Sequence, residues 1–143
     1  MTTAYYSHKT CIGHQPGSQH PESPDRLKAI NETFDCEEFI SLKFKVAKKA
    51  EPSVIELMHD PRYVKHVLDS IPEEGQKHLD PDTIVSPGSG EAALHAVGGV
   101  CDAVDLVLDG DADNAFCAFR PPGHHAERDR AMGFCLFNNA AIA

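Results

Sequence analysis

The sequence has few basic side chains. It contains 13 Lys and Arg against 22 Asp and Glu, which gives a formal net charge of −9. Binding to nucleic acid needs clustered Lys and Arg to neutralise phosphates, so this balance argues against a nucleic-acid partner. An acidic surface would instead favour cationic partners, such as Lys-rich peptides or polyamines, as weak long-range steering.

Membrane and export signals are also missing. No apolar run approaches the length that spans a bilayer, and residues 1–10 lack the basic flank and apolar stretch of a signal peptide. The five cysteines are odd in number and form no CxxC pair, which argues against a disulfide framework and suits thiols in a reducing compartment. We therefore expect a cytoplasmic protein without a membrane partner.

The chain has neither internal repeats nor low-complexity tracts. Its 143 residues are enough for one domain with a core, and 41% hydrophobic with 24% charged residues is ordinary for a globular protein. Ser23 and Pro24 suit a helix cap and a first helical position, so a helix is expected from there to about Phe34. Further elements expected before residue 72 are a strand over Thr3–Ser7, a loop over Cys11–Glu22, a strand over Phe44–Ala47, and short helices over Val54–Met58 and Arg62–Ile71.

The second half predicts a long helix and a buried strand. Prolines and glycines indicate a loop over Pro72–Gly90. An apolar helix should follow over Glu91–Asp109, with Gly98 and Gly99 allowing close packing and Gly110 ending it. The apolar run of Asn114–Phe119 is typical of a parallel strand buried on both faces.

This order of elements predicts an α/β fold with a parallel sheet flanked by helices. Loops at the carboxyl ends of parallel strands carry function, so the loop after Phe119 is the first place to look for chemistry. A last helix is expected from Phe137, capped by Asn138.

The loop after Phe119 reads Arg120-Pro121-Pro122-Gly123-His124-His125. The prolines restrict the backbone, the glycine permits close approach, and histidine is the usual general base near neutral pH. Two alternatives remain from these residues alone. The histidines could be a solvated surface pair, or both could ligate a metal, although two loop neighbours rarely chelate zinc without further ligands.

Residues 120–139, RPPGHHAERDRAMGFCLFNN, closely resemble the active-site signature of the histone deacetylase family, which includes acetylpolyamine amidohydrolases and bacterial deacetylase-like enzymes. Residues 20–30 (HPESPDRLKAI), 82–99 (DTIVSPGSGEAALHAVGG) and the region 59–67 agree with it as well. The Pro-Pro-Gly before the histidines is similar to the class II branch. The resemblance implies a zinc-dependent deacetylase that hydrolyses the acetyl amide of acetyl-lysine in proteins or of an acetylated polyamine.

The resemblance also implies roles for particular residues. His125 matches the general base that activates the zinc-bound water, and His124 matches the imidazole that stabilises charge as the reaction proceeds. Gly133 and Phe134 match the wall of a narrow substrate tunnel, and an apolar tunnel would desolvate the methylene stem. Arg26 matches an arginine near an internal channel, with a helix-surface ion pair as the alternative.

The family's zinc ligands, two aspartates and one histidine, lie further along the chain than His125. We therefore expect residues 1–143 to be the N-terminal part of a single deacetylase catalytic domain, with no metal site of its own and the ligands downstream of Ala143. Such a segment should be inactive alone, and should self-associate or need its C-terminal half. A catalytically inactive deacetylase-like binding or scaffold protein is the alternative.

Other candidates carry no chemistry in this interpretation. Cys135 is expected to be a buried packing residue, because no base is placed beside it. Helix capping or surface exposure is expected to explain most of the remaining histidines, which are His8, His14, His20, His59, His66, His78 and His95.

Overall fold

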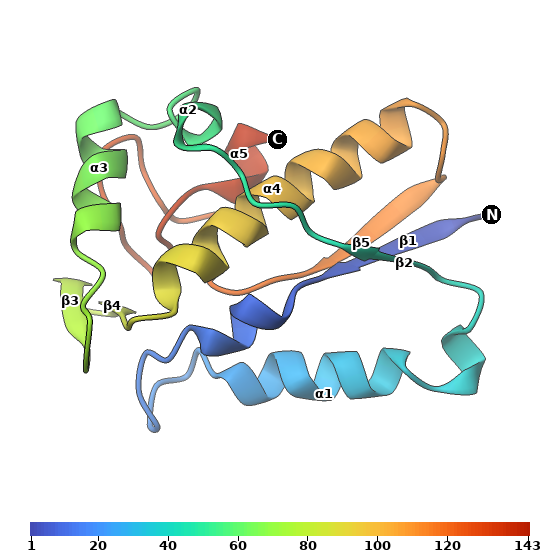
Figure 1. The fold of residues 1–143 in the computed structure, drawn as a ribbon, viewed down its shortest axis with the longest axis horizontal. Coiled ribbons are helices and arrows are strands. Elements are labelled where there is room, and N and C mark those ends of the chain that lie inside the picture. The colour runs from blue at the N-terminus through green and yellow to red at the C-terminus, as the bar shows by residue number, and fades with distance from the viewer.

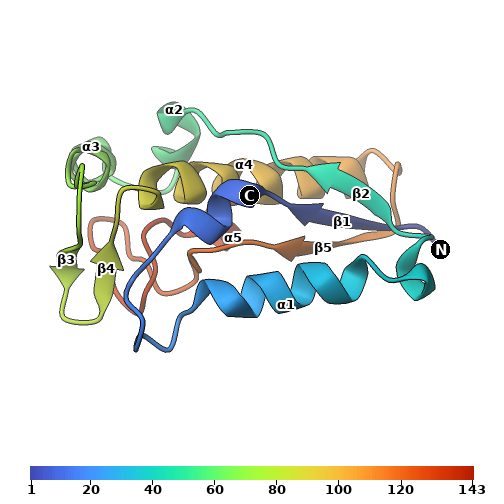
Figure 2. The same cartoon turned by 60° about the horizontal axis from the view of Figure 1, so that its bottom comes forward.

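The computed structural model of the protein describes residues 1–143 and has three layers. A parallel sheet of strand order β2-β1-β5 lies between α1 on one face and α4 on the other (Figures 1 and 2). The predicted parallel sheet flanked by helices is confirmed. The elements are β1 (Thr3–Ser7), α1 (Pro24–Phe34), β2 (Lys43–Val46), α2 (Pro52–Ile55), α3 (Pro61–Asp69), β3 (Lys77–Asp80), β4 (Thr83–Val85), α4 (Ser89–Leu108), β5 (Asn114–Ala118) and α5 (Asn139–Ile142), with short 3-10 helices at Lys9–Gly13 and Glu37–Phe39.

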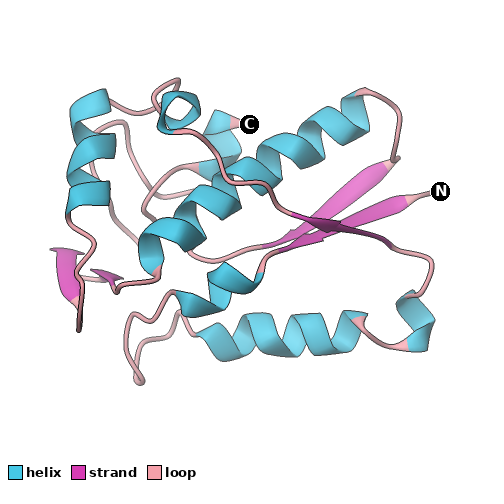
Figure 3. Ribbon diagram, in the orientation of Figure 1, coloured by secondary structure: helices cyan, strands magenta, loops and turns pink.

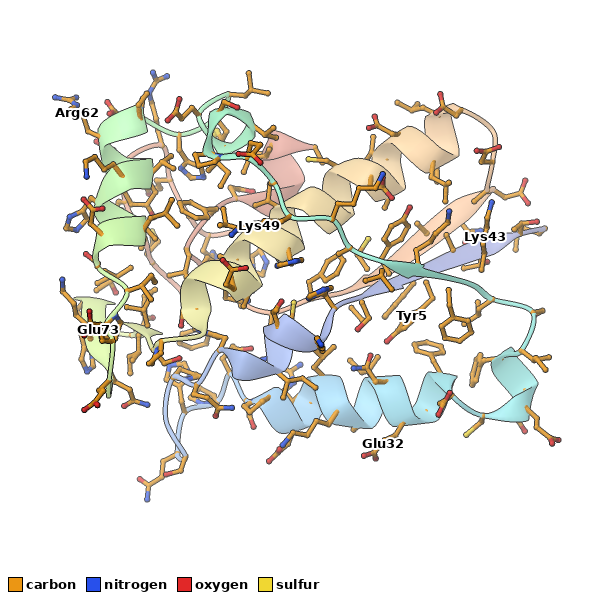
Figure 4. All side chains as sticks on the ribbon, in the orientation of Figure 1. Tyr5, Glu32, Lys43, Lys49, Arg62 and Glu73 are labelled. Atoms are coloured by element: carbon orange, nitrogen blue, oxygen red, sulfur yellow. The ribbon has the colours of Figure 1, made fainter.

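The central strand β1 joins the two sides of the core. Successive side chains of a strand point to opposite faces, and here Tyr5 packs against Phe34 of α1 while Tyr6 reaches α4. The Tyr6 hydroxyl donates a hydrogen bond of 2.7 Å to an oxygen of Asp102. Figure 4 shows Tyr5 between the sheet and α1, with Glu32 on the outer side of that helix. Both tyrosines are buried, because β1 is the central strand and α1 and α4 cover the two faces of the sheet.

The prediction for β5 is only partly correct. The strand forms, but it ends at Ala118 and lies at an edge of the three-stranded sheet. Of its residues only Ala118 is buried, and Phe116 is 46% exposed. An apolar run predicts two covered faces, whereas β5 pairs with β1 alone and α1 covers its face incompletely.

Helix α4 is buried along much of its length, as its apolar pattern predicts. Its two adjacent glycines lie where other parts of the chain cross it. A Cβ on Gly98 would lie 2.1 Å from the carbonyl oxygen of Lys48, and one on Gly99 would lie 2.2 Å from the ring of Phe119. The predicted close packing is confirmed, and Gly110 follows the helix with a φ of +78°.

The segment Pro72–Gly90 is not the plain loop that its prolines and glycines predict. It contains the antiparallel hairpin of β3 and β4, and its last two residues begin α4. Figure 3 shows this hairpin apart from the main sheet. The strands are only three and four residues long, and the turn residues Pro81 and Asp82 lie between them. Burial of Thr83 and Val85 against the rest of the chain stabilises this short pairing, and sequence periodicity cannot show that.

Side-chain caps begin three of the α-helices. The Ser23 hydroxyl accepts from the Asp25 amide at 3.3 Å, as predicted, and Asp60 accepts from the Arg62 amide at 2.8 Å. Asn138 accepts from the Ala141 amide at 3.1 Å, which confirms the predicted cap of α5. Helices α2 and α3 end earlier than predicted, at Ile55 and Asp69.

All five cysteines are free thiols, in agreement with the absence of a disulfide framework. Cys135 is fully buried, as predicted, and burial raises the pKa of its thiol. None of the helices has both the length and the apolar character that crossing a membrane would need.

Candidate active site

The loop after β5 is anchored by Arg120, a residue that the sequence did not single out. Its guanidinium is buried and pairs with the buried carboxylate of Glu22, with Nη2 2.7 Å from Oε2. It also donates to the carbonyl oxygens of Cys11 at 2.8 Å and His14 at 3.0 Å. Buried charges are costly unless they are paired and fully hydrogen-bonded. This cluster therefore fixes the loop after β5 to the loop after β1.

His14 completes this buried cluster. Burial, together with the positive charge of Arg120, lowers the pKa of His14 to about 3, so the imidazole is neutral. Its Nδ1 lies 2.7 Å from the Ser89 hydroxyl and its Nε2 lies 3.4 Å from the Glu22 carboxylate. Because the ring is neutral, the contact with Glu22 is a close polar contact rather than an ion pair.

His14 and His59 are exceptions to the prediction that capping or surface exposure explains most of these histidines. Both are only 1% exposed. The Nε2 of His59 accepts from the Asn138 amide at 2.9 Å, and its Nδ1 lies 3.3 Å from the Arg128 carbonyl. His59 thus links the loop after β5 to the start of α5. No sequence pattern predicted this contact.

The two predicted catalytic histidines, His124 and His125, are exposed in the first part of this loop. Their ring centroids lie 4.3 Å apart and the rings are tilted by 56°. Gly123 comes just before them, where a Cβ would lie 2.4 Å from the Phe137 carbonyl oxygen. Only glycine allows this approach, so the expected function of Gly123 is confirmed.

The two rings line different pockets. His124 lines one of about 300 Å³ together with Arg26, Glu22 and Arg120. His125 lines a second, polar pocket of about 240 Å³ together with Asp80, Asp82, Arg130, Met132 and Gly133. The histidine pair therefore stands between the two pockets.

Arg26 lies on α1 and lines the same pocket as His124. Its acidic neighbour on the helix, Asp25, pairs instead with Lys28 at 2.8 Å. The helix-surface ion pair that was the alternative for Arg26 is therefore not formed with Asp25. Its assignment to an internal channel stays a prediction.

Gly133 and Phe134 form a turn directly beside His125. Both have left-handed backbone conformations, with φ of 58° and 68°. A Cβ on Gly133 would lie 2.8 Å from Cδ2 of the His125 ring, so glycine and imidazole are in direct contact. The Phe134 ring packs edge-on against His20 with centroids 4.6 Å apart. Phe134 thus stands at the side of the pair, and its assignment to a tunnel wall stays a prediction.

Two residues of the β3–β4 hairpin hold this turn, and sequence reasoning missed both. Asp82 accepts from the Gly133 amide at 3.1 Å, and the Thr83 hydroxyl accepts from the Phe134 amide at 3.2 Å. Desolvation alone would raise the pKa of Asp82, but hydrogen bonds from Thr83 and from the Gly133 amide are among those that hold it below its usual value. The only signal in the sequence was that Asp82 and Thr83 begin residues 82–99, one of the stretches that resemble the histone deacetylase family.

The residues of this chain do not form a metal site. No group of three or more His, Cys, Asp or Glu side chains is arranged to hold an ion. His124 and His125 supply two imidazoles, while zinc in proteins is generally held by at least three protein ligands.

The fold and this loop define a member of the α/β deacetylase class, and the comparisons agree. The model of the histone deacetylase domain matches residues 20–143. The chain is 39% identical to histone deacetylase 5 of Arabidopsis thaliana over 96% of its own length, and 31% identical to a histone deacetylase-like amidohydrolase of Pseudomonas aeruginosa over 99%. The crystal structure of the HDA15 HD domain superposes with a TM-score of 0.88 at 30% identity over 99% of this chain.

The chain therefore belongs to the histone deacetylase family, whose members here are deacetylases and deacetylase-like amidohydrolases. It spans 22% of the Arabidopsis relative, 42% of the Pseudomonas relative and 41% of the HDA15 chain.

Proposed function

We propose that the protein carrying this chain removes acetyl groups from acetylated amines by hydrolysing the amide. His125 acts as the general base that takes a proton from the attacking water and returns one to the leaving amine. The observation that supports this most directly is the His125 ring itself, which is exposed to a polar pocket and held against Gly133. A general base must be within reach of the attacking water, and an exposed, fixed imidazole meets this condition.

His124 has a different part in the proposal. Its ring lies on the side of the pocket that holds Arg26 and the Arg120–Glu22 pair. There it stabilises the charge that develops on the acetyl group. Phe134, beside the pair, covers one side of the substrate stem and excludes water from it.

The proposed substrate is a cationic chain with an acetylated amine, either an acetyl-lysine peptide or an acetylated polyamine. The pocket beside His125 contains the carboxylates Asp80 and Asp82, and the chain carries a net charge of −9. Both favour basic partners through electrostatic steering. They do not separate the two substrates, which therefore have to be compared directly.

A zinc ion is part of the family's chemistry, but this chain does not supply its site. In the proposal the metal is held by other parts of the domain. This chain contributes the two imidazoles, the turn that carries Phe134 and the buried cluster that fixes the loop. We place the protein in the cytoplasm, which a fractionation experiment would check.

The experiment is a hydrolysis assay with the protein that contains this chain and the rest of the domain. We expect acetate release from an acetyl-lysine peptide or from an acetylated polyamine. A metal chelator should abolish the hydrolysis of whichever of the two substrates reacts faster. Binding of both compounds without acetate release would instead identify an acetyl-amine binding or scaffold protein and overturn the proposal.

The isolated chain should self-associate or bind the rest of its domain. Strand β5 is paired on one side only, and beside it lies an apolar groove of about 340 Å³ between α4 and β5. Unpaired strand edges recruit other chains, and apolar patches favour contacts. Light scattering of the purified 143-residue chain should show dimers or larger species. A monomer that unfolds cooperatively without a partner would contradict this expectation.

A further inference from the structure

The hairpin of β3 and β4 lies far from β5 in the sequence, yet it contacts the turn beside the histidines. Asp82 and Thr83 each accept one amide hydrogen of that turn, from Gly133 and Phe134. The Thr83 hydroxyl also donates to Asp82 at 3.1 Å, so the two acceptors are linked. Thr83 is fully buried, which fixes its position.

The turn needs such support because of its backbone. Phe134 has a φ of 68°, a conformation that a bulky residue adopts only when its surroundings impose it. The hydrogen bond from its amide to Thr83 is one such constraint. The packing of His20 on the Phe134 ring is a second, and His20 is itself bonded to the hairpin, with Nε2 3.2 Å from the Asp82 carbonyl oxygen.

The Gly133–Phe134 turn also fixes the position of His125. Gly133 touches the imidazole near Cδ2, and the thiol of Cys135 bridges the same two residues. It donates to the Gly133 carbonyl at 3.3 Å and accepts from the His125 amide at 3.5 Å. Any movement of the turn would therefore be felt at the His125 ring.

We propose that Asp82 and Thr83 are positioning residues, which hold the Gly133–Phe134 turn in its left-handed conformation and thereby set the place of the His125 imidazole. The effect of this role on catalysis rests on the proposed deacetylase function, whereas its effect on the turn does not. A displacement of a catalytic group by about 1 Å can lower a rate by up to about a hundredfold.

The test uses Thr83→Val and Asp82→Ala in the protein with its complete domain. Val fills the space of Thr without the acceptor, and Thr83→Ser and Asp82→Asn are matched controls that keep an acceptor oxygen. We expect amide hydrogen exchange at Gly133 and Phe134 to be about five- to tenfold faster in the Thr83→Val and Asp82→Ala variants than in the unsubstituted protein. The NMR resonance of the His125 ring hydrogen on Cδ2 should shift, and kcat should fall about tenfold or more. Both controls should restore the exchange rates and the His125 resonance. Only Thr83→Ser should also restore kcat, because Asp82 lines the substrate pocket whereas Thr83 is buried.

Each outcome decides one point. The proposal would be overturned if amide exchange and the His125 resonance were unchanged in both the Thr83→Val and the Asp82→Ala variants. This holds whether or not the variants are active. Faster exchange with normal kcat in an active enzyme would also overturn it. If the unsubstituted protein hydrolyses no acetyl amide, the proposed function fails, while the exchange rates and the ring resonance still decide the positioning role.

Discussion

Two groups of polar residues meet at the loop after β5 and differ in almost every physical respect. Arg120, with Glu22 and His14, is buried and satisfied by several protein hydrogen bonds. His124 and His125 are exposed, their rings contact each other, and His125 also contacts Gly133. The first group holds charge where water is absent, and the second presents imidazoles to solvent.

This difference separates positioning from chemistry. A buried charge pair contributes a fixed geometry, because removing either partner leaves an uncompensated charge. An exposed imidazole contributes little to folding but can exchange protons with substrate. The loop therefore needs both parts. Substitutions in the buried group should act on stability, and substitutions in the exposed pair should act on the reaction.

The largest expected effect is on catalysis. We expect His125→Ala to lower kcat for an acetylated substrate by about 10²–10⁴, the range for loss of a general base. His124→Ala should lower it less. Steady-state kinetics on the protein with its complete domain measure both, and chemical unfolding should show a change below about 0.5 kcal/mol, as for exposed positions. Near-normal kcat in His125→Ala with normal metal content would remove the proposed role.

The buried group should show the reverse behaviour. Arg120→Met leaves the Glu22 carboxylate buried without its partner, so we expect the free energy of unfolding to fall by about 3–5 kcal/mol. Arg130→Met is a matched control in the same loop, because Arg130 forms an exposed pair with Glu127 at 2.9 Å. Such surface pairs contribute about 0–1 kcal/mol. Urea unfolding of both variants makes the comparison, and equal losses would contradict the distinction.

Sequence reasoning found the exposed group and missed the buried one, for a physical reason. A strand followed by Pro-Pro-Gly-His-His is a local pattern, and a local pattern can be read directly from the chain. Glu22 and Arg120, which form the buried pair, are 98 residues apart in the sequence. The residues around either one do not indicate which residue it pairs with. The same holds for Asp82 with Gly133, which are 51 residues apart.

Errors in the predicted elements have the same origin. The cap of α1 by Ser23 and the end of α4 near Gly110 were predicted correctly, because they depend on neighbouring residues. The β3–β4 hairpin and the exposure of Phe116 depend on what packs against them. Both were therefore predicted wrongly from the run of residue types.

A smaller effect concerns pH. The pKa of His14 is about 3 in the folded chain and near 6.5 when unfolded, so the unfolded state binds the extra proton between these values. Stability should therefore be lost as the pH falls below about 6.5, with a limiting slope of about 1.4 kcal/mol per pH unit from this group. Urea unfolding between pH 6.5 and 4.5 should show this slope and its reduction in His14→Asn. His66→Asn is the control, because His66 is exposed on α3, and an equal change in both variants would contradict the assignment.

The smallest expected effect is the binding of metal by the 143-residue chain itself. If His124 and His125 were zinc ligands rather than proton-transfer groups, the exposed pair would belong to a fixed site, and its contrast with the buried cluster would disappear. The chain arranges no third ligand beside them, and two imidazoles alone hold zinc weakly. Metal analysis after dialysis should therefore give far less than one zinc per chain, and His124→Ala with His125→Ala should leave that amount unchanged. One tightly held equivalent that both substitutions remove would show that the two histidines are ligands, and the role of His125 as base would then be wrong.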